Sequence, residues 1–86
     1  MKNDQAKLPP VMEVRCGNIR AAIWKNEGGS GPWYNVTFTR SYREGTDYKT
    51  SGSFGRDDLL ILAKVADLAH TEIFALQRSD FENDEA

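Results

Sequence analysis

The chain has 86 residues, a formal net charge of -2, and 40% hydrophobic and 28% charged residues, a composition typical of one small globular domain. No apolar run reaches the ~20 residues that span a bilayer, and the polar N-terminal residues predict no secretory signal, so we expect a cytoplasmic protein that does not enter membranes. A single cysteine and a single histidine argue against an internal disulfide and a closed zinc site, and we expect no metal or other cofactor.

The charge is distributed unevenly along the chain. Residues 14–56 hold seven lysines and arginines against three acidic residues, whereas residues 57–78 carry a net charge of -2 and residues 79–86 carry -4. A phosphate backbone responds to the local patch of charge rather than to the total. The basic segment is therefore compatible with nucleic-acid binding.

Two short strands are predicted near the N-terminus. Residues 1–10 are polar and end in two prolines, which favours a disordered arm. Residues 11–15 alternate loosely between apolar and polar types and are a candidate first strand, followed by a turn signal. Residues 19–25 alternate with period two and place Ile19 and Ile23 on one face, together with Ala21.

A longer strand and a returning strand follow. The glycine-rich residues 26–32 predict a loop. Residues 33–42 are rich in β-branched and aromatic types, which predicts the strongest strand of the chain. Residues 44–47 predict a hairpin turn, and residues 48–54 predict the returning strand, with Phe54 on the buried face.

The hydrophobic period changes after Gly55. Residues 56–77 contain no glycine or proline, and their leucines and alanines predict one long helix. The acidic residues 79–86 predict a disordered tail, which is also a candidate contact for a partner protein. The predicted fold is α+β: a single β-β-β-β-α domain over residues 11–78, in which a four-stranded antiparallel sheet is followed by one long C-terminal helix packed on one face.

The predicted helix carries two apolar rows. One row is expected to cover the sheet, and its members are Leu59, Leu62, Ala66, Ala69, Ile73 and Leu76. The second row consists of Ile61, Val65 and Leu68. Because a core this small commonly needs support from a second chain, we expect the second row to form the interface of a homodimer. The other interpretation of this row is a thicker core without a dimer.

One helix can cover only one face of the predicted sheet. The opposite face is expected to be bare and to carry cations, hydroxyl and amide groups and a tryptophan, without a carboxylate. Its predicted members are Arg20, Ala22, Trp24, Asn35, Thr37, Thr39, Ser41, Arg43, Lys49, Ser51 and Ser53.

A face of this kind suits single-stranded nucleic acid. Cations neutralise phosphates, hydroxyl groups donate to phosphate and sugar oxygens, and aromatic rings stack on bases. The candidate binding residues are Arg20, Trp24, Arg43 and Lys49 on the face, with Arg40, Tyr42 and Trp33 at its margins. An exposed antiparallel sheet face is also commonly polar, so the alternative is a protein–protein interaction module without nucleic-acid binding. No set of catalytic residues is visible, and we do not expect an enzyme.

Three segments carry a resemblance to a known family. They are C-G-N-I-R-A-A-I-W-K-N-E-G-G, Y-N-V-T-F-T-R-S-Y-R-E-G and K-T-S-G-S-F-G-R-D-D-L, within residues 14–76. Together they resemble the small single-strand-binding transcriptional coactivators of the positive-cofactor type. The resemblance implies a four-stranded antiparallel sheet followed by a helix, dimerisation through that helix, and binding of single-stranded DNA on the sheet. Whirly-type and purine-rich-element-binding domains, which are similar single-strand binders, share this order of elements.

The resemblance also implies roles for individual positions. Those that fall on the family's glycine, basic, Arg-aromatic and helix-start positions are Gly17, Arg20, Lys25, Arg40, Tyr42, Lys49, Gly55, Arg56 and Asp57. Two features depart from the family: Arg56 stands where a proline is frequent, and the loop over residues 26–32 is longer. The resulting hypothesis is a homodimeric, sequence-tolerant binder of single-stranded nucleic acid, DNA more than RNA, that serves transcription or DNA maintenance.

Overall fold

The computed structural model describes residues 8–85, and within them the chain forms the α+β fold expected from the sequence. A four-stranded antiparallel sheet with the strand order β1-β2-β3-β4 is followed by one C-terminal helix. The elements are β1 (Met12–Cys16), β2 (Ile19–Gly28), β3 (Gly31–Glu44), β4 (Asp47–Ser51), the short 3-10 helix η2 (Arg56–Asp58) and α1 (Leu59–Glu85). Residues 11–15 are thus confirmed as the region of the first strand. The arm expected over residues 1–10 lies outside the described residues except for Leu8 to Pro10.

Tight turns join the strands and set their register. Gly17 and Gly45 have positive φ angles of 59° and 64°, which two-residue hairpin turns require and which glycine adopts without a steric penalty. The prediction of a loop over residues 26–32 is wrong, because β2 and β3 remain paired as far as Gly28 and Gly31. The glycines there allow a tight turn, so the strands run on through most of the segment.

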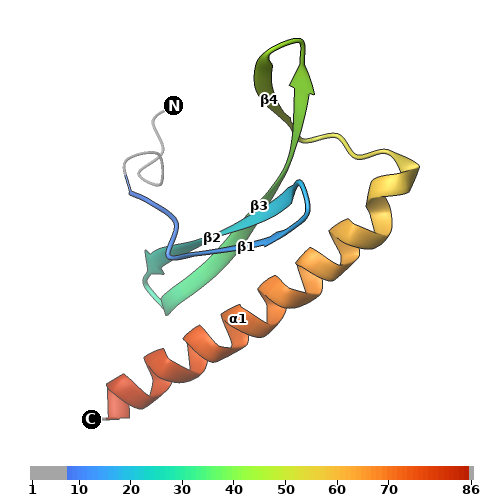
Figure 1. Cartoon of the computed structure of the whole chain (residues 1–86). Coiled ribbons are helices and arrows are strands. Elements are labelled where there is room, and N and C mark those ends of the chain that lie inside the picture. The colour runs from blue at the N-terminus through green and yellow to red at the C-terminus, as the bar shows by residue number, and fades with distance from the viewer. Residues whose placement is uncertain (1–7, 86) are drawn as a thin grey trace.

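The helix α1 lies across one face of the sheet (Figure 1). Its Val65 and Ala69 are buried against Ile19 and Ile23 of β2, with Ala21 between them on the same strand. Alternation along β2 directs these three residues to one side. Partly buried side chains complete this core, and they are Met12, Val14, Cys16, Tyr34, Val36, Phe38, Phe54, Leu62, Ile73 and Leu76.

The face of α1 that meets the sheet agrees with the predicted row at Leu62, Ala69, Ile73 and Leu76, which belong to the core or pack against it, and differs at two positions. Leu59, expected to face the sheet, is 49% exposed, whereas Val65, expected at a dimer interface, is 0% exposed within the single chain. Ile61 is exposed and Leu68 is half-buried. The two apolar rows lie side by side on the helix, so packing against the sheet decides which residues are covered.

The expectation of a disordered tail over residues 79–86 is also wrong for its described part. The helix α1 continues through this segment to Glu85. Asp80 explains the extension, because its carboxylate accepts hydrogen bonds from the ammonium of Lys25, at 3.0 Å, and from the hydroxyl of Tyr34. These contacts hold the last turns of the helix against the sheet, although acidic residues near a helix C-terminus oppose the helix dipole.

The outer part of β3 and the strand β4 form a hairpin that projects away from the helix (Figure 1). The helix begins near the base of this hairpin, after the connection over residues 52–55. Arg40 fastens the connection, because its Nε donates a hydrogen bond to the carbonyl oxygen of Ser53 at 3.0 Å and lies 3.5 Å from a carboxylate oxygen of Asp58. Within residues 8–85, α1 therefore covers one face of the sheet and leaves the opposite face and the outer hairpin uncovered.

Candidate nucleic-acid interface

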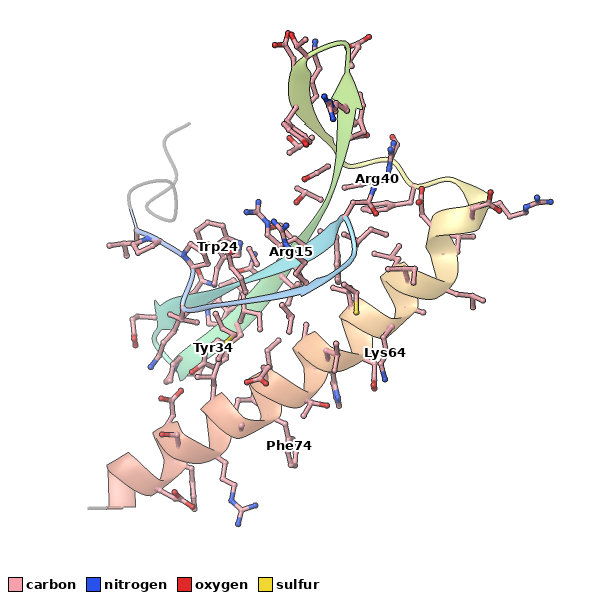
Figure 2. The ribbon with its side chains drawn as sticks, in the orientation of Figure 1. Arg15, Trp24, Tyr34, Arg40, Lys64 and Phe74 are labelled. Carbon is pink, nitrogen blue, oxygen red and sulfur yellow. The ribbon has the colours of Figure 1, made fainter. Side chains whose placement is uncertain are left out.

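The sheet face opposite α1, called the open face below, carries side chains from all four strands. Antiparallel register places Arg15 of β1, Arg20 of β2 and Thr39 of β3 in one row. Side chains that are direct neighbours across antiparallel strands point to the same face. Figure 2 shows Arg15 and Trp24 on the side of the sheet away from α1, and Tyr34 between the sheet and α1. The open face thus has a basic centre formed by two adjacent strands.

Two tryptophans lie at one end of the open face. Trp24 is half-buried, and its Nε1 donates a hydrogen bond to the hydroxyl oxygen of Thr37 at 3.0 Å. Trp33, on the neighbouring strand, is exposed and lies close to Gly28. The hydrogen bond orients the Trp24 indole over the sheet. The two rings therefore supply flat surfaces beside the basic row.

A second aromatic group lies at the other end, on the projecting hairpin. Arg43 of β3 and Tyr48 of β4 are direct partners across the ladder, and the guanidinium carbon of Arg43 lies 5.6 Å from the centre of the Tyr48 ring. Tyr48 is 76% exposed. The open face thus runs from tryptophans through arginines to an Arg–Tyr pair.

The charge of the open face is positive but includes one carboxylate. Glu13 of β1 lies on this face, and its Oε2 is 3.7 Å from Nη1 of Arg20. The expectation of a face without carboxylates is therefore wrong. The reason is that β1 contributes a row of its own, with Glu13 opposite Ala22. An exposed ion pair of this kind contributes only about 0–1 kcal/mol, so Arg20 can exchange Glu13 for a phosphate at little cost.

Lys49 does not lie on the open face, contrary to the prediction. The register pairs Lys49 with Tyr42 and pairs Tyr48 with Arg43, so Lys49 points to the side of α1. There its Nζ lies 3.2 Å from Oε1 of Glu44. The prediction extended strand alternation to Phe54, but β4 ends at Ser51 and the chain then leaves the sheet. Ser51 changes face with Lys49 for the same reason.

Arg40 and Tyr42 also point to the side of α1, at the base of the hairpin. The guanidinium carbon of Arg40 lies 5.4 Å from the Tyr42 ring centre, in addition to the contacts of Arg40 with Ser53 and Asp58. Arg40 is therefore held by the connection to the helix. Of the seven predicted binding residues, the structure gathers four on the open face, namely Arg20, Trp24, Trp33 and Arg43.

Sequence reasoning missed Arg15 and Tyr48. Arg15 is identified once the turn at Gly17 and Asn18 is treated as a tight hairpin, because Arg15 and Arg20 are then opposite each other. Tyr48 is identified by counting outward along both strands from the turn at Gly45, which pairs it with Arg43.

A polar cluster of Lys25, Tyr34 and Asp80 lies on the other side of the sheet. The hydrogen bond from Tyr34, and then the one from Lys25, lowers the pKa of Asp80 below its ordinary value. The hydrogen bond that Lys25 donates to Asp80 raises the pKa of Lys25. The pKa of Tyr34 is raised by burial and, to a smaller extent, by its hydrogen bond to Asp80. The family resemblance places Lys25 among the basic positions of the early strands. In the structure Lys25 faces α1, and its contact with Asp80 holds the helix against the sheet.

Two features of the described residues bear on metal binding and on membrane insertion. Residues 8–85 hold no group of three or more histidine, cysteine, aspartate and glutamate side chains arranged to bind a metal ion. None of the helical segments described combines the length and apolarity needed to cross a membrane. No protein-family model matches the chain, and no curated protein or solved structure is similar enough to count as a match.

Proposed function

We propose that this chain binds single-stranded nucleic acid, DNA more than RNA, on the open face and without strong sequence preference. The observation that carries the proposal is the order of groups along the bare strands. Tryptophans lie at one end, Arg15 and Arg20 in the middle, and the Arg43–Tyr48 pair at the other end. From Trp33 to Arg43, β3 advances about 33 Å at about 3.3 Å per residue. This length allows several nucleotides to lie along the face.

The chemistry of these groups favours a single strand over a duplex. Arginines neutralise phosphates and release counterions, and the hydroxyls of Thr37 and Thr39 can bond to the sugar-phosphate backbone. Aromatic rings stack on unpaired bases, which a duplex keeps stacked inside its own helix. The proposed role is binding, with no chemical step. The resemblance to single-strand-binding coactivators of the positive-cofactor type supports the same proposal.

A homodimer is part of the proposal, but its interface lies on a different face of α1 from the predicted one. We define the outer stripe of α1 as Leu60, Ala63, Asp67, His70, Phe74, Gln77 and Phe81, all of them exposed. Leu60 is 84%, Phe74 65% and Phe81 63% exposed, and Phe74 points away from the sheet (Figure 2). The members alternate in steps of three and four residues, which is the spacing of helices that pack side by side.

The two polar residues near the middle of the outer stripe favour a second copy of this chain as the partner. In an antiparallel pair with its two-fold axis between Asp67 and His70, Asp67 of each copy meets His70 of the other. The same arrangement sets the small Ala63 opposite the large Phe74. A two-fold interface has this self-complementary form, because residue i meets residue j and j meets i.

The binding proposal is tested by fluorescence anisotropy with labelled oligonucleotides of equal length. Single-stranded DNA, single-stranded RNA and duplex DNA are compared at low and higher salt. We expect single-stranded DNA to bind most tightly, and we expect Arg43→Ala to weaken binding and to reduce the slope of log Kd against log salt by about one.

The matched control is Arg78→Ala. Arg78 is an exposed arginine of α1 whose Nε lies 3.6 Å from Oε2 of Glu82, and its removal is expected to leave the slope unchanged. Absence of binding to any single strand at low salt, or equal losses in the two variants, refutes the open-face proposal.

A further inference from the structure

A small pocket lies beside Trp24, where the N-terminal arm passes the end of β2. Its volume is about 230 Å³, and its lining residues are Leu8, Pro9, Val11, Trp24, Lys25 and Glu27. Pockets for drug-sized ligands begin at about 300 Å³, so this one fits a single ring system better than a whole nucleotide.

Backbone and side-chain contacts hold the walls of the pocket. The backbone N–H of Val11 donates to the carbonyl oxygen of Ile23 at 2.9 Å, which fixes the arm alongside β2 just before β1 begins. The indole of Trp24 is held by its bond to Thr37. Leu8 and Val11 are exposed apolar side chains and form an aliphatic wall that no other described element covers. The apolar part of the pocket wall is therefore an aromatic ring and aliphatic groups.

The two charged side chains that line the pocket, Lys25 and Glu27, differ in their contacts with the rest of the protein. The ammonium of Lys25 lies 3.0 Å from Oδ1 of Asp80, so its charge is compensated by α1. Glu27 is exposed, and its carboxylate can only accept hydrogen bonds when ionised. Of the two charged side chains that line the pocket, the one not held by α1 is thus the acceptor Glu27, and the complementary ligand carries N–H donors.

We propose that this pocket takes one unstacked nucleobase that carries an exocyclic amino group, and that Glu27 accepts a hydrogen bond from that group. The inference rests on the proposed binding of single-stranded nucleic acid. Trp24 stacks on the base, Leu8 and Val11 enclose it, and Glu27 reads its edge. A carboxylate accepting from the amino group of cytosine is an established way to read that base.

The same chemistry disfavours thymine and uracil. These bases have no amino group, and their one ring N–H on the pairing edge lies between two carbonyl oxygens. A carboxylate that approaches this edge meets the negative end of both carbonyl dipoles. The open face then binds strands of any sequence, whereas the Trp24 pocket adds a preference at one position of the strand.

The test measures the ratio of Kd for oligothymidine to Kd for oligodeoxycytidine of equal length, with the full chain at one salt concentration. We expect Glu27→Gln to lower this ratio about fivefold, the lower end of the discrimination that one specific base contact provides. Leu8→Ser, which removes part of the aliphatic wall, is expected to lower the ratio in the same direction.

The matched control is Glu44→Gln in the projecting hairpin. It also removes one exposed carboxylate, and its weaker repulsion of phosphates affects both oligonucleotides equally, so the ratio is expected to stay unchanged. An unchanged ratio in Glu27→Gln, with both oligonucleotides still bound, overturns the base pocket and leaves the proposed function standing. Absence of binding to both oligonucleotides at low salt overturns the proposed function itself.

Discussion

Trp24 occupies the position on which the proposed interaction with bases most depends. It lies on the open face, its indole N–H is held by Thr37, and its ring forms one wall of the pocket beside the arm. A half-buried, oriented ring loses little side-chain entropy on binding, because its rotamer is already restricted. Trp24 is therefore expected to contribute more to affinity than the more exposed Trp33.

Replacing Trp24 tests stacking directly. Trp24→Ala is expected to weaken binding of single-stranded DNA by about 1–3 kcal/mol, the contribution of one base–aromatic stack. Fluorescence anisotropy at fixed salt measures the loss. Trp24→Phe keeps a flat ring and is expected to retain most of the affinity. Equal affinities in the alanine variant and the native chain would contradict a stacking role.

The pKa shift of Asp80 predicts how stability changes in acid. Its pKa is lowered from the ordinary value of 3.8, so the folded state favours the ionised form. This contribution to stability is fully present above the ordinary pKa and is lost as pH falls through the lower pKa of the folded state. At the alkaline end, Lys25 and Tyr34 have raised pKa values, so their contributions are lost as pH rises past those values.

The variant Asp80→Asn tests how much of the loss of stability in acid comes from Asp80. We expect this variant to have a Tm a few degrees below that of the native chain at neutral pH, because the ion pair with Lys25 is lost. The native Tm decreases in acid as carboxylates become protonated, and the difference between the two proteins is expected to narrow below the ordinary Asp80 pKa of 3.8. Thermal melts followed by circular dichroism across this range provide the check. A constant difference at all pH values would show that the charge of Asp80 is not the cause.

At the scale of elements, packing against the sheet decides which apolar residues of α1 are buried. Val65 is fully buried, while Ile61, four residues earlier, remains partly exposed. Both were expected in the same interface row. A helix rotates about 100° per residue, so residues four apart differ in direction by about 40°. That angle is enough to place one under the sheet and the other at its edge.

Alanine substitutions in α1 test this assignment. Val65→Ala is expected to lower the free energy of unfolding by about 2 kcal/mol, because it removes buried methyl groups from the single-chain core. Ile61→Ala is expected to cost about 0.5 kcal/mol. Urea unfolding at several protein concentrations gives both values. If the loss in Val65→Ala shrank when the protein was diluted, Val65 would belong to an interface between chains instead.

At the scale of the whole molecule, residues 8–85 form two layers and leave two surfaces uncovered. The Cα extents are 52 × 31 × 18 Å, and the sheet forms one layer and α1 the other (Figure 1). The open face lies on one outer side of this stack and the outer stripe of α1 on the other. Two copies joined through their outer stripes would therefore present their open faces on opposite sides of the dimer.

The oligomeric state is tested by sedimentation equilibrium. We expect the native chain to be a dimer, and Phe74→Glu to shift it to a monomer, because a charge would replace an aromatic ring at the proposed contact. Tyr48→Glu places the same charge at an exposed aromatic position of the hairpin and is expected to leave the dimer intact. A native chain that sediments as a monomer at all concentrations would rule out the second copy as the occupant of this stripe.

The order of the elements and the inward face of β2 could be predicted from the sequence. Alternation at Ile19, Ala21 and Ile23 depends only on neighbours in the chain, and so does the change of period after Gly55. The faces on which Lys49 and Ser51 lie could not be predicted by counting back from Phe54. The strand β4 ends at Ser51, so the alternation of side chains between the two faces does not continue from Ser51 to Phe54. Arg15 could be placed opposite Arg20 only from the register of the first hairpin, which depends on the turn at Gly17 and Asn18.

The sequence by itself determined which segments become strands and which becomes the helix, because local periodicity and turn residues are properties of neighbouring positions. The tertiary structure alone decided that Val65 is buried under the sheet while Leu59 stays exposed, and it decided the length of the helix past residue 78. It also brought the arm beside Trp24. Each of these depends on contacts between residues far apart in the chain, such as Lys25 and Asp80. The bare, positively charged face is thus foreseeable from alternation, whereas its full membership and the pocket at its end arise only when the strands pair and the helix packs.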